Sequence, residues 1–216
     1  MKLYSGPLSM FGAKAEIALR EKGLDFDLEM VGFNQQALYR PHHPEVARVN
    51  PKAQVPVLID GDLEIFDSTL IFEYLEDRCP RPPLWPQAPA DRARARLLEL
   101  TSDEVFFPPV SRVMALKGAS AHPEAAPHCA AIARYYDAMD RLLADRDYLA
   151  GSYSYADIAL YMAQFFAARH GAKMSSAQAN LTAWRVRVSQ RPAVGAVIGA
   201  MADYLRSTNL PVPDYA

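Results

Sequence analysis

Short apolar runs and helical repeats alternate along the first 78 residues. Residues 1–4 are apolar and are cut off by Ser5-Gly6-Pro7, which predicts a strand followed by a loop. Residues 10–22 contain no proline, repeat apolar positions near the helical spacing and are followed by Gly23, so we expect a helix there. The pattern then predicts a strand over 24–31, an irregular polar stretch over 33–50, two strands over 55–62 and 63–66 around an Asp60-Gly61 turn, and a helix over 69–77.

A cluster of prolines separates this half from the rest of the chain. Five prolines stand between positions 80 and 89, as is typical of a boundary between domains. Beyond them we expect amphipathic helices over 91–105 and 128–144, a nearly all-apolar and therefore buried helix over 155–168, and two more over 181–189 and 194–205. The prediction is an α/β domain over residues 1–78, a linker over 79–88 and an all-helical domain over 89–216.

Composition narrows the class of protein. Half of the 216 residues are apolar and 22% are charged, which is typical of a globular chain. The net charge of −2 argues against nucleic-acid binding through bulk charge. Cys79 and Cys129 form neither a CxxC pair nor a disulfide framework, which fits a reducing compartment. No apolar run approaches the roughly 18 residues of a membrane helix, and the start lacks a signal-peptide pattern, so we expect a cytoplasmic protein without a membrane segment.

Common motifs for metal and nucleotide chemistry are missing. The chain contains no G-x-x-x-x-G-K, GxGxxG, HExxH or G-x-S-x-G pattern. His42, His43 and Glu45 are close together, but no fourth ligand follows at a suitable spacing. We therefore expect no bound metal and no nucleotide cofactor.

Ser9 lies directly before the first expected helix, and two interpretations are open. Its side-chain oxygen can cap free backbone N–H groups of that helix. The N-terminus of a helix also favours anions, and a thiolate there would be stabilised relative to its thiol. A hydroxyl at this position could donate a hydrogen bond to such a sulfur.

Two further dipeptides have both a structural and a chemical interpretation. Pro56 either makes a rigid strand entry or, through a cis Val55-Pro56 bond, leaves the main chain of Val55 free to pair with an extended peptide. Asp67 or Ser68 can cap the following helix, or else hold a ligand ammonium and carboxylate, respectively. With Ser9, these positions describe a site for a small peptide that carries an amine, a carboxylate and a thiol.

Four segments resemble the cytosolic glutathione transferases, and the similarity extends over essentially the whole chain. They are LYSGPLSMFGAKAEIALREKGL, NPKAQVPVLIDGD, IFDSTLIFEYLED and GSYSYADIAL, in the family's order and around a proline-rich linker. In the last segment Ser154 and Asp157 stand at the spacing of a capping box. The resemblance implies a thioredoxin-like α/β domain followed by an all-α bundle, and a homodimer with the helix after Asp67 near the subunit contact.

The resemblance to serine-type members also assigns roles to residues. Ser9 would hydrogen-bond the glutathione sulfur, and Val55, followed by the family's cis-proline Pro56, would pair with the cysteinyl unit. Gln54 and His42 would reach the glycyl end. Asp67 and Ser68 would bind the γ-glutamyl group, with aspartate where glutamate is commoner in the family.

The expected reaction is the transfer of glutathione, as co-substrate, to a small, apolar, aromatic electrophile. The activated thiolate would attack without a covalent protein intermediate. FDSTLIFEYLED is also similar to bacterial β-etherase-like members, so a glutathione-dependent β-etherase, dehalogenase or isomerase is the alternative, and a non-catalytic binding or regulatory protein of this fold is another. PLSMFGAKAEI lacks a cysteine, which disfavours glutaredoxin-like or omega-type disulfide chemistry.

The second substrate is expected to bind between the domains. Phe106-Phe107-Pro108-Pro109 interrupts a helical stretch with aromatic residues and prolines, where a helix can bend and open a cleft. The alternative is that the same side chains form interdomain core. The residues expected to line the pocket are Met10, Phe11, Phe106, Phe107, Val110, Arg112 and Met114.

Overall fold

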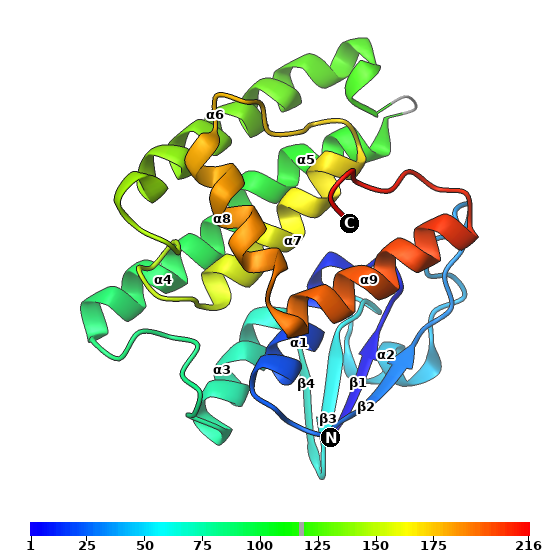
Figure 1. Ribbon diagram of the computed structural model, residues 1–216. Coiled ribbons are helices and arrows are strands. Elements are labelled where there is room, and N and C mark those ends of the chain that lie inside the picture. The colour runs from blue at the N-terminus through cyan, green and yellow to red at the C-terminus, as the bar shows by residue number, and fades with distance from the viewer. Residues whose placement is uncertain (117–118) are drawn as a thin grey trace.

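A computed structural model describes residues 1–116 and 119–216 (Figure 1). Its sheet has the order β2-β1-β3-β4, formed by β1 (Lys2–Ser5), β2 (Asp27–Met30), β3 (Val57–Asp60) and β4 (Leu63–Phe66). β1 runs parallel to β2 and antiparallel to β3, and β3 forms a hairpin with β4. Gly61 makes the hairpin turn with a φ of 62°, a left-handed conformation that glycine adopts at little cost. The predicted strands are confirmed, although β2 and β3 are shorter than expected.

The alternation of side chains along β1 produces two packed layers. Leu3 and its neighbour Leu58 on β3 lie in the main core with helices α1 (Met10–Glu21) and α3 (Ser68–Arg78). Tyr4 points to the opposite face, where it packs with Val57 and with Val46 of the short helix α2 (Pro44–Val49). This is the thioredoxin-like arrangement that the family resemblance implies.

Helix α2 (Pro44–Val49) corrects the expectation of an irregular stretch over 33–50. Pro44 occupies its first turn, where the missing N–H is tolerated because that group has no partner inside the helix. Of its six residues only Val46 is buried, so the segment is too short and too polar to produce a visible helical period.

Helices form the rest of the described chain, with α7 at their centre. They are α4 (Pro89–Thr101), a π-helical turn (Ser102–Phe106), α5 (Phe107–Ala115), α6 (Ala126–Leu142), α7 (Tyr155–Arg169), α8 (Ala179–Ser189) and α9 (Pro192–Ser207), with short 3-10 turns at Ala119–Ala121, Pro123–Ala125 and Leu143–Asp145. α7 is buried over nearly its whole length, as its apolar sequence predicts. Figure 1 shows α9 beside α1, so the helical part also packs on the first domain.

The π-helical turn replaces the last residues of the helix expected over 91–105. Pro108 and Pro109 carry no N–H, so the carbonyls of Glu104 and Val105 lose their usual donors four residues ahead. The Phe107 N–H instead reaches back to the carbonyl of Ser102, which widens the turn. The prolines therefore produce a local change of helix geometry rather than a chain break.

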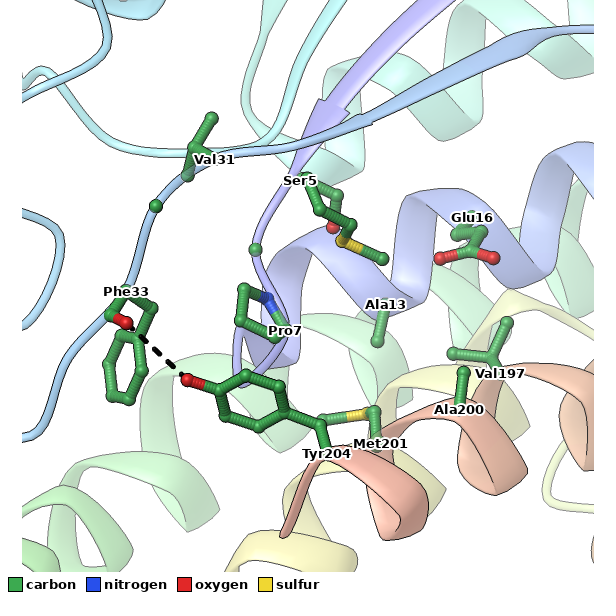
Figure 2. A pocket seen from close by; sticks show the side chains of 13 residues that line it. Ser5, Pro7, Ala13, Glu16, Val31, Phe33, Val197, Ala200, Met201 and Tyr204 are labelled. Atoms are coloured by element: carbon green, nitrogen blue, oxygen red, sulfur yellow. Dashed lines mark hydrogen bonds between the residues drawn. The ribbon is translucent and has the colours of Figure 1, made fainter. Parts of the chain in front are cut away.

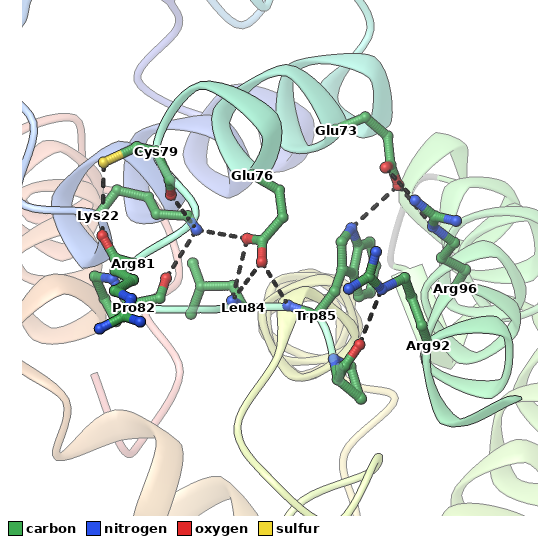
Figure 3. Close-up of polar contacts among 11 residues, drawn as sticks. Lys22, Glu73, Glu76, Cys79, Arg81, Pro82, Leu84, Trp85, Arg92 and Arg96 are labelled. Carbon is green, nitrogen blue, oxygen red and sulfur yellow. Dashed lines mark hydrogen bonds and ion pairs between the residues drawn. The ribbon is translucent and has the colours of Figure 1, made fainter. Parts of the chain in front are cut away.

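A buried ion pair fastens the linker to the first domain (Figure 3). The ammonium of Lys22, at the end of α1, lies 2.5 Å from a carboxylate oxygen of Glu76 on α3 and donates to the carbonyls of Cys79 and Pro82 at 2.8 Å each. The Glu76 carboxylate also accepts the main-chain N–H of Leu84, at 3.1 Å from Oε2. Lys22 and Glu76 thus provide hydrogen-bond partners for main-chain carbonyl and N–H groups of the linker.

Within the residues that the structure describes, none of the helices combines the length and the apolar character needed to cross a membrane.

Candidate functional site

A cleft of about 380 Å³ opens at the N-terminus of α3, against the π-helical turn. Five of the positions that the family resemblance assigned to glutathione line it together: Gln54, Val55, Pro56, Asp67 and Ser68. Phe11, expected in the second-substrate pocket, lines the same cleft. The remaining lining residues were not anticipated from the sequence: Asn50, Lys52, Phe66, Thr69, Leu70, Leu100, Asp103 and Glu104.

The loop before β3 presents the main chain of Val55. The Val55-Pro56 bond is cis. Neither the N–H nor the carbonyl of Val55 has a hydrogen-bond partner in the part of the chain that the structure describes, so both are available to a ligand. Buried Asn50 holds the loop by donating to the Gln54 carbonyl at 2.7 Å and accepting the Lys52 N–H at 2.9 Å. An extended peptide could therefore pair with Val55 as an added strand.

Asp67 has an unusual backbone at the start of α3. Its φ is 78°, a left-handed conformation that costs free energy for a residue with a side chain. Asp67 Oδ1 accepts the Thr69 N–H at 2.9 Å, which caps the helix, and this leaves Oδ2 for a ligand. Ser68 follows as the first helical residue and is buried at the cleft wall. The capping role and the ligand-binding role proposed for Asp67 are thus compatible.

Ser9 caps α1: its Oγ accepts the Gly12 N–H at 3.0 Å. The cap uses Ser9 as an acceptor, so the hydroxyl proton is free to be donated. Ser9 is 8% exposed and is not among the residues that line the cleft, whereas Phe11, two positions later, is. The side chain lies at the N-terminus of α1, where the helix dipole and free N–H groups favour an anion.

Two basic side chains flank the loop before Val55. His42 is exposed, and its Nδ1 lies 2.9 Å from the Ala53 carbonyl, so it stands beside the cleft rather than in it. Lys52 lines the cleft and is exposed. A signal for Lys52 was present in the sequence, because it belongs to the segment NPKAQVP that carries the resemblance.

A buried charge cluster lies behind the cleft, between α1, α4 and the π-helical turn. The Lys14 ammonium is fully buried, lies 2.9 Å from Glu99 Oε1 and contacts Asp103 Oδ2. Asp103 Oδ1 is buried and has no hydrogen-bond partner within the described residues. Burial raises the pKa of Asp103 to about 6; Lys14 opposes this shift and Glu99 adds to it. Two acids facing one lysine make this wall of the cleft favourable to a cation.

The structure separates the residues expected in the second-substrate pocket. Met10, Phe106 and Val110 are buried in the core, which matches the interdomain-core alternative for these side chains. Phe107 meets Phe11 edge to face, with ring centroids 5.6 Å apart, so one aromatic contact does join the two domains beside the cleft. Met114 is half-buried against the core and Arg112 is exposed.

Among residues 1–116 and 119–216, no group of three or more histidine, cysteine, aspartate or glutamate side chains has an arrangement that could hold a metal ion.

Comparison with protein families agrees with this geometry. Residues 3–83 match the glutathione S-transferase N-terminal domain, and residues 104–192 match the glutathione S-transferase C-terminal domain. Together the two matches cover most of the chain. The protein belongs to the glutathione S-transferase superfamily.

Individual relatives divide between enzymes and a stringent starvation protein. The chain is 40% identical over 109 residues to the stringent starvation protein A homolog of Coxiella burnetii, a match covering 50% of this chain and 48% of the relative. It spans about half the length of the curated relatives it matches. A sphingomonad glutathione S-transferase solved with glutathione superposes with a TM-score of 0.78 at 29% identity, covering 93% of this chain and 98% of the other. The β-etherase LigF of Sphingobium sp. strain SYK-6 superposes with a TM-score of 0.76 at 26% identity, covering 92% of this chain and 98% of the other.

Proposed function

We propose that this protein is a serine-type glutathione transferase that binds glutathione in the cleft at the N-terminus of α3. The observation that carries the proposal is the free main chain of Val55, placed in one cleft with Lys52 and with the Asp67-Ser68 pair. These groups match a tripeptide: Lys52 suits a terminal carboxylate, the Val55 main chain suits the peptide backbone, and the Asp67-Ser68 pair suits the amino and carboxylate groups at the other end. The sphingomonad relative, solved with glutathione, supports the same ligand.

Ser9 supplies the chemistry in this proposal. Its hydroxyl donates to the glutathione sulfur at the N-terminus of α1 and stabilises the thiolate over the thiol. Such a charge-assisted hydrogen bond is worth about 1.5–3 kcal/mol. The thiolate then attacks an electrophilic carbon, and the leaving group departs with the bonding electrons. The aromatic pair Phe11 and Phe107 beside the cleft favours an aromatic electrophile.

The same thiolate chemistry serves a β-etherase, a dehalogenase or an isomerase, which differ in the second substrate. Structural similarity to the β-etherase LigF makes aryl ethers the first alternative to test.

A second candidate function is a non-catalytic binding or regulatory role. It is favoured by the 40% identity to a stringent starvation protein A homolog over half of the chain. The cap from Ser9 to Gly12 gives this serine a structural role that needs no catalysis.

We further propose a cytoplasmic homodimer. Three large leucines are exposed on α3 and α4, with Leu70 57%, Leu97 58% and Leu100 52% exposed. Leu70 and Leu100 both line the cleft. Leu97 precedes Leu100 by three residues on α4, the spacing of neighbours on one helix face, so the three side chains form one exposed apolar group. Cys79 and Cys129 are free thiols, which fits a reducing compartment.

Calorimetric titration with glutathione, followed by a conjugation assay, tests the proposed activity. We expect glutathione to bind and Ser9→Gly to lower turnover about ten- to a hundredfold with binding kept, because glycine is nearly as good a cap but has no hydroxyl. The electrophile panel contains aryl halides, epoxides, isothiocyanates and aryl ethers. Absence of glutathione binding would overturn the proposal. Binding without turnover on the whole panel would favour the regulatory candidate, and full activity of Ser9→Gly would remove Ser9 from the mechanism.

A further inference from the structure

A second cavity, of about 370 Å³, lies between the β1–α1 loop, α1, the end of β2 and α9 (Figure 2). It shares no lining residue with the glutathione cleft. Gly6 and Pro7 of the β1–α1 loop line this cavity, and in the same loop the Ser9 N–H donates to the Gly6 carbonyl at 3.1 Å. Its size falls in the range of small-molecule sites, about 300–1,000 Å³.

Most residues that line this cavity are apolar, and contacts between Tyr204 and Phe33 hold two of its aromatic walls in place. The Tyr204 hydroxyl donates to the Phe33 carbonyl at 3.4 Å, and the two rings lie 6.3 Å apart in an edge-to-face arrangement. Tyr204 and Met201 come from α9 and Phe33 follows β2, so the cavity exists only where the two domains meet (Figure 2). The other apolar lining residues are Pro7, Ala13, Met30, Val31, Val197 and Ala200.

Glu16 is the one charged residue that lines the cavity among the residues described by the structure. It is 3% exposed and stands on α1 opposite Val197 and Ala200 (Figure 2). Its Oε1 pairs with Arg20, 2.8 Å from Nη2, while Oε2 has no hydrogen-bond partner in the described chain.

Arg20 compensates the buried negative charge of Glu16 only in part, because it pairs with one of the two carboxylate oxygens. Burial raises the pKa of Glu16, and the partly exposed Arg20 only opposes this shift. A buried carboxylate with an unpaired oxygen gains from a second cation, because charges interact more strongly away from water. Apolar and aromatic walls around one such carboxylate are complementary to a cation with an apolar body.

We propose that this cavity is a second ligand site, independent of glutathione, that binds a small aromatic amine. The ammonium group lies at Glu16 Oε2, and the ring lies between Phe33, Met201 and Tyr204. Neutral molecules of the same shape would fill the apolar part but leave Glu16 Oε2 without a cation, and anions would be repelled.

Calorimetric titration with three probes of the same shape tests this site: 1-naphthylmethylammonium, 1-naphthylmethanol and 1-naphthoate. We expect the amine to bind at least about tenfold more tightly than the alcohol, the naphthoate not to bind, and saturating glutathione to leave the amine affinity unchanged. Glu16→Gln should abolish the difference between amine and alcohol.

Two tryptophan substitutions on α9 locate the binding. Ala200 is exposed and lines the cavity, so Ala200→Trp should fill it and abolish binding of the amine. Ala196 is exposed one turn earlier and does not line the cavity, so Ala196→Trp should bind the amine like the unchanged protein. Equal affinity for amine and alcohol in the unchanged protein, unchanged binding in Ala200→Trp, or displacement of the amine by glutathione would each overturn the proposal. Displacement would place the amine in the glutathione cleft.

Discussion

Trp184 on α8 donates its indole N–H to the carboxylate of Asp157 on α7, with Nε1 2.8 Å from Oδ1. The same carboxylate accepts the main-chain N–H groups of Leu149 and Ser154 at 2.9 Å each. Asp157 is fully buried, so one side chain caps α7, fixes the preceding loop and joins α7 to α8. The serine and aspartate expected to form a capping box do so, and the tertiary structure adds the tryptophan.

Asp157→Ala is expected to be the most destabilising of the substitutions considered. It leaves three buried N–H donors without a partner, at about 1–3 kcal/mol each. We therefore expect a loss of several kcal/mol in the free energy of unfolding, measured by urea denaturation. Asp203→Ala, which removes an exposed partner of Arg206, should change this free energy by less than about 0.5 kcal/mol. Equal effects of the two substitutions would contradict the central role of Asp157.

Lys22→Met should destabilise the protein by about 3–5 kcal/mol, because it leaves the buried Glu76 carboxylate without its cation. It also removes the donor to the Cys79 and Pro82 carbonyls, so the linker should loosen. Thermal unfolding measures the first effect and limited proteolysis near the linker measures the second. Arg94→Met breaks the exposed pair with Asp91 and is the matched control, with little effect expected.

Asp103 predicts a pH dependence of stability. Its folded-state pKa of about 6 lies above the value of about 3.9 expected in the unfolded chain, so between these values the folded protein holds the proton more tightly. The contribution of Asp103 to the free energy of unfolding therefore falls as the pH rises through this window and is constant above it.

Asp103→Asn, followed by denaturant unfolding across the same pH window, measures this contribution. The variant should gain stability relative to the unchanged protein as the pH rises, and its own pH dependence should be shallower. Burial also raises the pKa of Asp157 to about 6, so its contribution to stability falls with rising pH in the same way. Part of the pH dependence should therefore remain in the Asp103→Asn variant. A parallel pH dependence of the two proteins would show that Asp103 titrates as in the unfolded chain.

Light scattering should give the mass of a dimer, twice 24.0 kDa, for the unchanged chain. Leu97→Glu, on the exposed face of α4, should shift the protein to monomer, because a charge in an apolar interface must lose its water. Val186 on α8 is 48% exposed and lies outside the group formed by Leu70, Leu97 and Leu100, so Val186→Glu should remain dimeric. A monomeric unchanged protein would contradict the proposed subunit contact.

Local sequence signals pointed to many of the residues that line the cleft at the N-terminus of α3. Proline before a strand, an aspartate-serine pair before a helix and a serine before the first helix are signals between neighbouring residues, and the structure brings most of the corresponding side chains to one cleft. The residues expected to line a second-substrate pocket do not come together in the same way. Phe106 and Phe107 are adjacent in sequence, yet the first is buried in the core and the second contacts Phe11, because helical geometry sends neighbouring side chains in different directions.

The sequence by itself determined the strands, most of the long helices, the caps at Ser9, Asp67 and Ser154 and the two-part class of fold, because periodicity, turn residues and capping act over a few positions. Only the tertiary structure decided contacts between distant positions. Lys14 meets Asp103 across 89 positions, and Arg191 reaches Glu21 across 170. The second cavity likewise exists because α9 packs beside α1, so that Met201 and Tyr204 line the same cavity as Glu16. Such long-range contacts depend on how whole helices and strands pack, and the local sequence pattern does not predict that packing.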